Sequence, residues 1–485
     1  MSGNIAESWT GSPPPRPTAA YRGLSLGQWS FWAALPAIAV LGLIQAPDLL
    51  ALISFALVQA AFLAVGLWRL TLATTGLRRP AAPVPVPTPD LPRYTILAAL
   101  HDEAEVVPQL IRRLAAIDYP PDRLQAMLLL ETDDAPTIAA ALTTPRPDWL
   151  QVVIVPDGRP RTKPRALNHG LARATGDLVT IYDAEDQPHP GQLRETAARF
   201  AADVEEQVGC IQSPLRIRPV DHADLGGRLL GRQFAVEYAA LFEVTLPAMA
   251  QLGLPFPLGG TSNHFRIEAL RQAGGWDAWN VTEDADLGLA LWRDGWRLDV
   301  ARLPTLETAP RRLHDWLPQR TRWLKGFLQT WGVHTRDPRG LGWRGNLALV
   351  MTIGAPLVSA ACHAGSLAVI AVLVMVALLA GLPPAAPIAA MGVMSLGIVS
   401  AWINGAIGAR RAGVRFGLFE IATSPVVWAL LSLALAHAVW RLLREPFAWD
   451  KTAHEPDRIE VEAQIDADDP LLEIDKALRF GTVSH

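Results

Sequence analysis

Charged residues and cysteines are scarce in parts of this chain, and their scarcity excludes several classes of protein. No Asp, Glu, Lys or Arg occurs between Asn346 and Ala409. The bilayer interior penalises each charge by a few kcal/mol, so this segment indicates a membrane protein. Two cysteines, Cys210 and Cys362, cannot build a disulfide framework or a CxxC zinc site. A hydrophobic content of 50% excludes a disordered chain, and 43 basic against 47 acidic residues exclude a protein that coats nucleic acid.

The first part of the chain predicts a tail followed by a transmembrane hairpin. Residues 1–26 are rich in proline and serine, lack the features of a signal peptide, and are expected to be disordered. Two uncharged stretches, Gly27–Pro47 and Leu49–Trp68, are each long enough to cross a bilayer and place a hairpin in residues 27–72. Arginines flank both ends, so the positive-inside rule predicts that both ends are cytoplasmic. These arginines are Arg16, Arg22, Arg69, Arg78 and Arg79.

A proline-rich linker, residues 73–93, leads into a segment of ordinary soluble composition, residues 94–337. Short β-type runs alternate there with helical patterns, which predicts a doubly wound α/β sheet whose ligands bind at the carboxyl ends of the strands. The predicted strands are Tyr94–Leu100, Ala126–Leu130, Val152–Val155, Leu178–Tyr182 and Val208–Gln212.

Residues 338–444 are expected to form further transmembrane and interfacial helices. Gly354 and Pro356, and then Gly381–Pro387, interrupt the uncharged segment. Two spans, which the charge rule favours, would return the chain to the cytoplasm at Arg410, Arg411 and Arg415, whereas three would place these arginines outside. Gly417–Trp440 contains Glu420 and Pro425, so an interfacial or re-entrant helix is expected there. Trp402 and Asn404 are the candidates for lining a translocation path. Residues 445–485 are expected to be a cytoplasmic segment that resembles a gating loop, followed by an acidic tail.

An acidic turn is the strongest candidate for chemistry. Asp183-Ala-Glu185-Asp186 follows the apolar run Leu178–Tyr182. Carboxylates so close together at a strand end can converge on Mg²⁺ or Mn²⁺, and such an ion can bridge a diphosphate. The alternative is a solvated acidic turn.

Two further motifs have a structural and a functional interpretation. Thr282-Glu283-Asp284 either begins a helix, with Thr282 as its cap, or supplies a general base that accepts a proton from a hydroxyl. Gln319-Arg320-Thr-Arg322-Trp323 is either a juxtamembrane basic segment or a site that binds phosphate and a sugar ring.

In order along the chain, the motifs resemble the membrane-embedded glycosyltransferases of family 2, which include cellulose, chitin and hyaluronan synthases. The resemblance covers residues 97–327 and implies a GT-A nucleotide-sugar domain. The motifs are Glu103, Thr162-Lys163-Pro-Arg165-Ala-Leu-Asn168, Asp183-Ala-Glu185-Asp186, Gly259-Gly-Thr261-Ser-Asn263, Thr282-Glu283-Asp284 and Gln319-x-x-Arg322-Trp323.

The resemblance also implies roles for individual residues. Asp284 corresponds to the catalytic base, and the metal ligands come from Asp183, Glu185 and Asp186. The expected nucleotide-sugar contacts are Glu103, Glu131, Asp133, Lys163, Asp183 and Arg322, with Glu131 preferred over Asp133 for the base. The expected acceptor contacts are Glu283, Gln319 and Trp323. Trp449, Lys451 and Thr452 loosely resemble a gating loop. The chain departs from the family pattern at His101-Asp102-Glu103 and at Glu131-Thr-Asp133-Asp134.

The sequence therefore predicts an inverting, metal-dependent glycosyltransferase in the inner membrane. The expected donor is a UDP-sugar, by resemblance, and the expected acceptor is a growing polysaccharide at the cytoplasmic face. The alternative is a transferase that adds one sugar to a lipid acceptor, and a third class is a catalytically silent receptor or scaffold with the same fold. Expected partners are the nucleotide-sugar donor, the polysaccharide or glycolipid acceptor, the lipid bilayer and accessory export subunits, and no nucleic acid.

Overall fold

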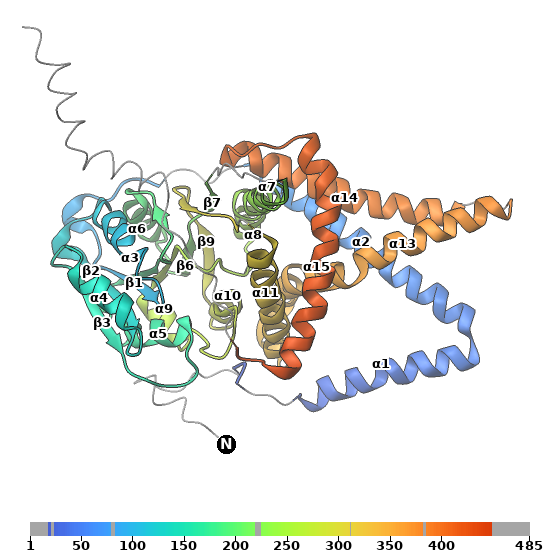
Figure 1. Ribbon diagram of the computed structural model, residues 1–485, viewed down its shortest axis with the longest axis horizontal. Helices are drawn as coiled ribbons and strands as arrows, with labels where there is room; N and C mark the ends of the chain where they lie inside the picture. The colour runs from blue at the N-terminus through green and yellow to red at the C-terminus, as the bar shows by residue number, and fades with distance from the viewer. Residues whose placement is uncertain are drawn as a thin grey trace, which may run out of the picture.

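The computed structural model describes residues 18–20, 24–78, 83–218, 225–310, 312–381 and 385–448. Within them, an α/β domain lies at one end of the molecule, and long helices project from the other end (Figure 1). The gating candidates Trp449, Lys451 and Thr452 lie outside the described residues.

The α/β domain is built on a seven-stranded sheet with strand order β3-β2-β1-β4-β8-β6-β9. Strands β3, β2, β1 and β4 are parallel, whereas β8 runs antiparallel to both of its neighbours. The strands are β1 (Tyr94–Leu100), β2 (Leu124–Glu131), β3 (Leu150–Val155), β4 (Leu178–Ile181), β6 (Val208–Gln212), β8 (Asn263–Arg266) and β9 (Arg297–Val300). The predicted α/β sheet is confirmed, and its central strands are apolar because both faces are covered.

Helices cover this sheet, and a small second sheet extends it. The second sheet has the order β5-β10-β7, with β5 (Gln187–Pro188), β7 (Leu215–Ile217) and β10 (Thr305–Glu307). The helices of the domain are α3 (Val107–Ala115), α4 (Ala135–Thr143), α5 (Lys163–Leu171), α6 (Gln192–Ala202), α9 (Ile267–Gln272) and α10 (Glu283–Arg293). The carboxyl ends of β1, β2 and β4 are left open between them.

Five helical segments among the described residues are long and apolar enough to span a bilayer. They are Leu26–Gln45, Pro47–Thr75, Pro338–His363, Ile388–Ala412 and Leu418–Arg444. The helices concerned are α1 (Leu26–Gln45), α2 (Pro47–Thr75), α12 (Gly342–Leu349), the π-helical turn η6 (Val350–Gly354), α13 (Ala355–Leu379), α14 (Ala385–Ala412) and α15 (Leu418–Arg444). Between this group and the sheet lie α7 (Leu225–Ala240), the π-helical turn η4 (Leu241–Thr245), α8 (Leu246–Gln251) and α11 (Leu313–His334).

Helix α15 lies beside the α/β domain and contacts it at both ends. At its start, the Gln233 side chain of α7 donates to the Glu420 carbonyl oxygen at 2.6 Å. Just beyond its end, Lys325 Nζ of α11 donates to the Ala448 carbonyl oxygen at 2.7 Å. The helix runs across the direction of α13 and α14 (Figure 1). The helix is continuous through Pro425, and its length and composition are those of a candidate membrane span. The interfacial or re-entrant helix expected from the sequence stays a prediction.

Helices α10 and α11 meet at a contact that excludes any side chain. A Cβ atom added to Gly326 of α11 would lie 2.2 Å from Thr282 Oγ1, which belongs to the residue that precedes α10. Thr282 occupies the cap position without a capping hydrogen bond from its side chain. The contact with Gly326 therefore fixes where α10 begins relative to α11.

Replacing Gly326 by alanine should destabilise the protein, because the branched Thr282 side chain has no space to yield. We expect a loss of about 1–3 kcal/mol, the usual range for overpacking. Gly332 lies in the same helix, and a Cβ atom added there would meet nothing within 4 Å, so Gly332→Ala is the matched control and should be neutral or stabilising by up to about 1 kcal/mol. Thermal unfolding of the detergent-solubilised full chain measures both. Equal midpoints for the two variants would contradict the packing argument.

Candidate functional site

A cavity of about 850 Å³ opens at the carboxyl ends of β1, β2 and β4 and continues toward the apolar helices. Most of the residues singled out in the sequence line this cavity. They are Glu103, Glu131, Lys163, Asp183, Glu185, Glu283, Asp284, Gln319, Arg322 and Trp323. Asp133 and Asp186 are not among its lining residues. One cavity thus joins motifs from the whole length of the α/β domain.

The carboxylates of the acidic turn after β4 lie in two different environments. Asp183 and Glu185 face the cavity, whereas Asp186 is fully buried beneath them. Asp186 Oδ2 accepts the Asp183 backbone N–H at 2.7 Å and also the Thr261 hydroxyl. Burial, together with the charges of Asp183 and Glu185, raises the pKa of Asp186 well above its usual range. The structure therefore places Asp186 as a support for the turn, outside the cavity where a metal ligand is expected.

Lys163, the first residue of α5, is ion-paired with Asp183 across the cavity floor. Its Nζ also donates to the Gly260 carbonyl oxygen at 2.7 Å. Burial opposes the charge of Lys163, but the charges of Asp183 and Glu283 outweigh burial and raise the pKa of Lys163. A fixed cation at this point can bind a diphosphate oxygen.

Glu307, on β10 of the second sheet, adds another carboxylate to this floor. Burial, followed by the charges of Asp186, Glu185 and Asp183, raises the pKa of Glu307 well above its usual range. Among the described residues there is no ready-made group of three metal ligands. Asp183 and Glu185 therefore offer a partial ligand set, and the remaining positions of a cation would have to be filled by the substrate or by water.

The first turn of α10 carries the candidate base. Asp284 faces the cavity, and its Oδ1 accepts the Ala285 N–H at 2.8 Å. Burial raises the pKa of Asp284 above its usual value, opposed by this hydrogen bond and by the charges of Lys163 and Arg322. Burial and the neighbouring Asp284 charge raise the pKa of Glu283 to about 8. Two adjacent carboxyl groups with different environments suit different chemical tasks.

Helix α11 presents one face to the cavity, with Gln319, Arg322, Trp323 and Phe327 along it. The spacing of these residues is the i, i+3, i+4 pattern of a single helical face. Arg322 lies close enough to oppose the charges of Glu283 and Asp284, and its guanidinium donates to the Val281 carbonyl oxygen at 3.4 Å.

Trp323 is held in place by its neighbours. The Arg320 guanidinium lies 4.5 Å from the centre of the Trp323 ring and makes two hydrogen bonds to Glu237 of α7, at 2.6 and 2.7 Å. Tyr238 lies on another side of Trp323, with ring centres 6.4 Å apart. Glu237 and Tyr238 both line the cavity, so α7 completes the wall that faces α11.

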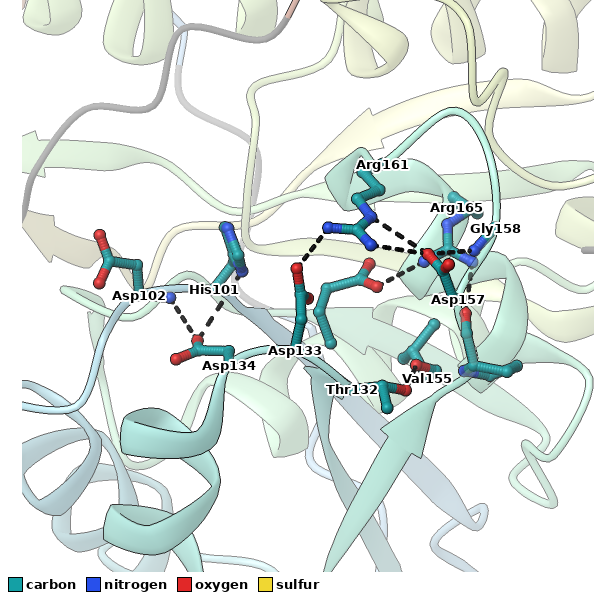
Figure 2. Close-up of polar contacts among 12 residues, drawn as sticks. His101, Asp102, Thr132, Asp133, Asp134, Val155, Asp157, Gly158, Arg161 and Arg165 are labelled. Carbon is teal, nitrogen blue, oxygen red and sulfur yellow. Dashed lines mark hydrogen bonds and ion pairs between the residues drawn. The ribbon is translucent and has the colours of Figure 1, made fainter.

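At the other end of the cavity, the two acids proposed to contact the nucleotide base differ in their positions. Glu131, at the end of β2, lines the cavity and is paired with the buried Arg165. Asp133 is half exposed and paired with Arg161, which also contacts Asp157 (Figure 2). Burial raises the pKa of Glu131, and Arg165 partly offsets this effect. Glu131 therefore lines the cavity, whereas Asp133 lies outside it and is paired with the lining residue Arg161.

Asp134 supports the unusual His101-Asp102-Glu103 segment. Its carboxylate accepts the Asp102 backbone N–H (Figure 2). It also accepts, at 3.2 Å, the N–H of Thr137 in the first turn of α4. Asp102 adopts a φ of 55°, in the left-handed region that few residues other than glycine and asparagine favour. Glu103 is buried at the cavity edge, and its N–H donates to Thr137 Oγ1 at 2.9 Å. The departure from the family pattern thus has its own local support.

The far end of the cavity is formed by apolar residues of α2, η6 and α13. Lining residues there are Val65, Trp68, Leu72, Met351, Ala355 and Pro356, with Arg69 and Thr352 among them. Trp402 and Asn404 are not lining residues. Trp402 Nε1 donates to Ser424 Oγ at 2.9 Å, and Asn404 Nδ2 donates to the Arg69 carbonyl oxygen at 3.0 Å. These two residues join helices instead of lining a path.

Several cavity residues were not singled out in the sequence. Glu307, Arg161, Glu237, Tyr238 and Trp68 come from strands, loops and helices outside the six motifs. Only the tertiary fold brings them together, so no local pattern identifies them. Arg161 is different, because it directly precedes the Thr162-Lys163 motif, and its position in the sequence could have identified it.

Comparison with known proteins agrees with this geometry. The family described as Glycosyl transferase family group 2 matches residues 178–436, and Glycosyl transferase family 2 matches residues 95–217. A beta-monoglucosyldiacylglycerol synthase of Synechocystis is 28% identical over 269 residues, 53% of this chain and 53% of the relative. A cellulose synthase catalytic subunit of Komagataeibacter sucrofermentans is 27% identical over 53% of this chain and 33% of its own length. The chain thus spans about half the length of the first of these curated relatives and a third of the second.

A solved structure shows the same fold. The mannosyltransferase of Pyrobaculum calidifontis, in complex with GDP-Man and Mn²⁺, superimposes with a TM-score of 0.53 at 20% identity, over 80% of this chain and 99% of the other. The GT-A fold predicted from the sequence is therefore confirmed, flanked by helices that could span a membrane. The chain belongs to family 2 of the glycosyltransferases.

Proposed function

We propose that this enzyme transfers one sugar, with inversion, from a nucleotide-sugar to a lipid acceptor at the cytoplasmic face of the inner membrane. One observation carries the choice of acceptor: the cavity that contains Asp183 and Asp284 continues into an apolar wall formed by Trp68, Leu72 and Met351. Such a wall can hold the hydrocarbon part of an amphipathic acceptor while its hydroxyl reaches the base.

The sequence favours a growing polysaccharide as acceptor, which remains the second candidate. The printed names of the relatives support both classes, since one forms a glycolipid and the other is a cellulose synthase subunit. A path for a glycan would need polar and aromatic residues along the helices. Trp402 and Asn404, the candidates for that role, are bonded to neighbouring helices instead. This arrangement favours the lipid acceptor and leaves no specific reason to invoke export subunits.

The cavity floor suits a divalent cation. Asp183 and Glu185 are hard oxygen ligands that face the cavity, and Glu307 adds a third carboxyl group to its lining. The solved relative that binds GDP-Man also contains Mn²⁺. Asp183 and Glu185 would hold Mg²⁺ or Mn²⁺, which would supply positive charge for the diphosphate leaving group.

The protein's own residues stabilise the leaving group, accept the proton and orient the acceptor. Lys163 and Arg322 supply fixed positive charge for the diphosphate as it departs, and UDP is the proposed nucleotide. Asp284 accepts the proton of the acceptor hydroxyl, and Trp323 and Gln319 orient the acceptor beside it. Glu103 and Glu131 close the nucleotide end. A single displacement by the hydroxyl needs no enzyme nucleophile and inverts the anomeric centre.

Contacts between the helices and the α/β domain support the proposed orientation. The start of α1 is bound to α11, where Gln28 Nε2 donates to the Gly332 carbonyl oxygen at 2.8 Å. The end of α14 is bound to η4, where Arg411 donates to the Glu243 carbonyl oxygen at 2.6 Å. The hairpins thus have their arginine-bearing ends on the side of the α/β domain, which the positive-inside rule assigns to the cytoplasm.

Product analysis tests the acceptor class directly. The full chain in phosphatidylcholine nanodiscs that contain diacylglycerol should convert a nucleotide-sugar into a product that extracts into chloroform and carries one sugar. Mass spectrometry of both phases counts the sugar units. A water-soluble polymer with many units would overturn the lipid proposal in favour of the polysaccharide.

Blocking the apolar end of the cavity should separate acceptor use from donor use. Ala355 lines that end, so Ala355→Trp should lower kcat/KM for the lipid acceptor by about 10-fold or more while slow donor hydrolysis continues. Ala361 is exposed on the same helix, and Ala361→Trp serves as the matched control. Equal acceptor kinetics in both variants would show that the lipid does not enter there.

Removing the base should abolish transfer without loss of nucleotide affinity. We expect Asp284→Asn to lower kcat by about 100- to 10,000-fold, because the amide cannot accept the hydroxyl proton. Calorimetric titration with UDP should give a nearly unchanged Kd. Asp148→Asn, at an exposed site outside the cavity, controls for handling. Normal turnover by Asp284→Asn would refute the assignment.

The raised pKa of Glu283 predicts a loss of donor affinity in alkaline solution. With a pKa of about 8, Glu283 is protonated and neutral near pH 7. Above pH 8 it gains a negative charge beside Asp284 that repels the diphosphate, so KM for the nucleotide-sugar should rise about 10-fold once the group is ionised. Glu283→Gln stays neutral and should show no such rise. If KM rises equally with pH in the wild type and in Glu283→Gln, a group other than Glu283 causes the loss of affinity above pH 8.

A further inference from the structure

A second cavity, of about 520 Å³, lies where the α/β domain meets the ends of α2 and α14. It is distinct from the cavity described above. Arg78, three residues beyond α2, and Arg411, in the last turn of α14, form its membrane side. Arg194, Arg216 and Arg302 come from the α/β domain. Five arginines thus converge on one cavity at the level where membrane helices end.

The acids in this cavity are already neutralised by other groups. Glu243 of η4 is ion-paired with Arg216 at 2.7 Å. Glu195 of α6 accepts the backbone N–H groups of Arg302 and Leu303, at 2.9 and 2.7 Å, and is paired with Arg199 at 3.0 Å. The two lining acids therefore do not neutralise the remaining arginines.

Arg78 and Arg302 are the cations available for a ligand. Both are exposed, and the side chain of neither makes a hydrogen bond or ion pair with any residue in the described part of the chain. Each reaches the cavity from a different side, since Arg78 follows a membrane helix and Arg302 follows β9. Two guanidinium groups that face one cavity suit an anion with several oxygens, such as a phosphate.

The remaining lining is apolar. Pro83, Pro85 and Val86 come from the linker, and Phe242 and Pro247 come from η4 and α8. A soluble anion gains nothing from this surface, whereas a phospholipid presents a phosphate beside its glycerol and acyl chains. Cationic residues at the ends of membrane helices lie at the depth of lipid headgroups.

We propose that this cavity binds the headgroup of an anionic phospholipid, with Arg78 and Arg302 contacting the phosphate. The site is separate from the acceptor site in position and in chemistry. Phe242 forms part of both cavities, and neighbouring residues of one segment divide between them: Leu215 faces the first cavity, whereas Pro214 and Arg216 face the second. A bound headgroup therefore lies directly behind the wall of the acceptor site.

Native mass spectrometry of the full chain in detergent, titrated with phosphatidylglycerol, tests the proposal. The wild-type protein should retain one phosphatidylglycerol in preference to phosphatidylcholine. The double variant Arg78→Gln/Arg302→Gln should bind phosphatidylglycerol about 30-fold more weakly, as expected for two basic residues at a lipid surface. Both substituted residues are exposed, and an unchanged Kd for UDP verifies that the variant is folded.

A matched double variant removes the same charge elsewhere. Arg112 and Arg297 are exposed and line neither cavity, so Arg112→Gln/Arg297→Gln should bind phosphatidylglycerol like the wild type. If both double variants bind phosphatidylglycerol equally weakly, net charge alone explains the effect, and the proposed lipid site is overturned. Inorganic phosphate is the second probe. Displacement of the lipid by millimolar phosphate would show a soluble-anion site and overturn the lipid assignment, and retention of the lipid would support it.

Discussion

The buried carboxylate of Asp186 is the constraint on which the rest of the site depends. It binds the Asp183 N–H and the Thr261 hydroxyl, and so fixes the turn after β4 against the segment that enters β8. That segment includes Gly260, whose carbonyl oxygen accepts Lys163. Lys163 in turn is paired with Asp183. Asp186, which does not line the cavity, thus sets the spacing of Asp183 and Lys163, which do. Its burial strengthens the hydrogen bonds that hold this arrangement.

The parts of the site that the sequence predicts are those that each motif contains locally. Lys163 follows a turn and begins a helix, Asp183 follows a strand, and Asp284 lies in the first helical turn after a threonine. Local patterns of this kind place a residue on the open edge of the sheet regardless of distant contacts. The order of the motifs then resembles one family, which supplies the fold. Asp186 and Asp133 show the limit of that approach. Asp186 is buried beneath its turn, whereas Asp133 is half exposed, and the local sequence does not distinguish either residue from the acids that face the cavity.

The membrane-facing part of the site could not be predicted in the same way. Trp68 and Met351 are separated by the whole α/β domain in sequence, and nothing in either segment distinguishes a cavity wall from a lipid-facing surface. Glu307 joins the acidic floor only because the second sheet folds beneath it. Gln233 and Lys325 hold the two ends of α15, and they lie 187 and 123 residues before the residues to which they donate. Tertiary contacts, not composition, decide such features.

The contact between Gly326 and Thr282 leaves no room for even a methyl group, so α10 and α11 are in direct contact at this point. Asp284 and Trp323 thus lie on two helices that touch each other. In the proposed mechanism, the wall formed by Trp68, Leu72 and Met351 offers water few hydrogen-bond partners and would limit hydrolysis of the donor. The hydrocarbon lining is then a barrier to wasteful hydrolysis as well as a seat for the acceptor.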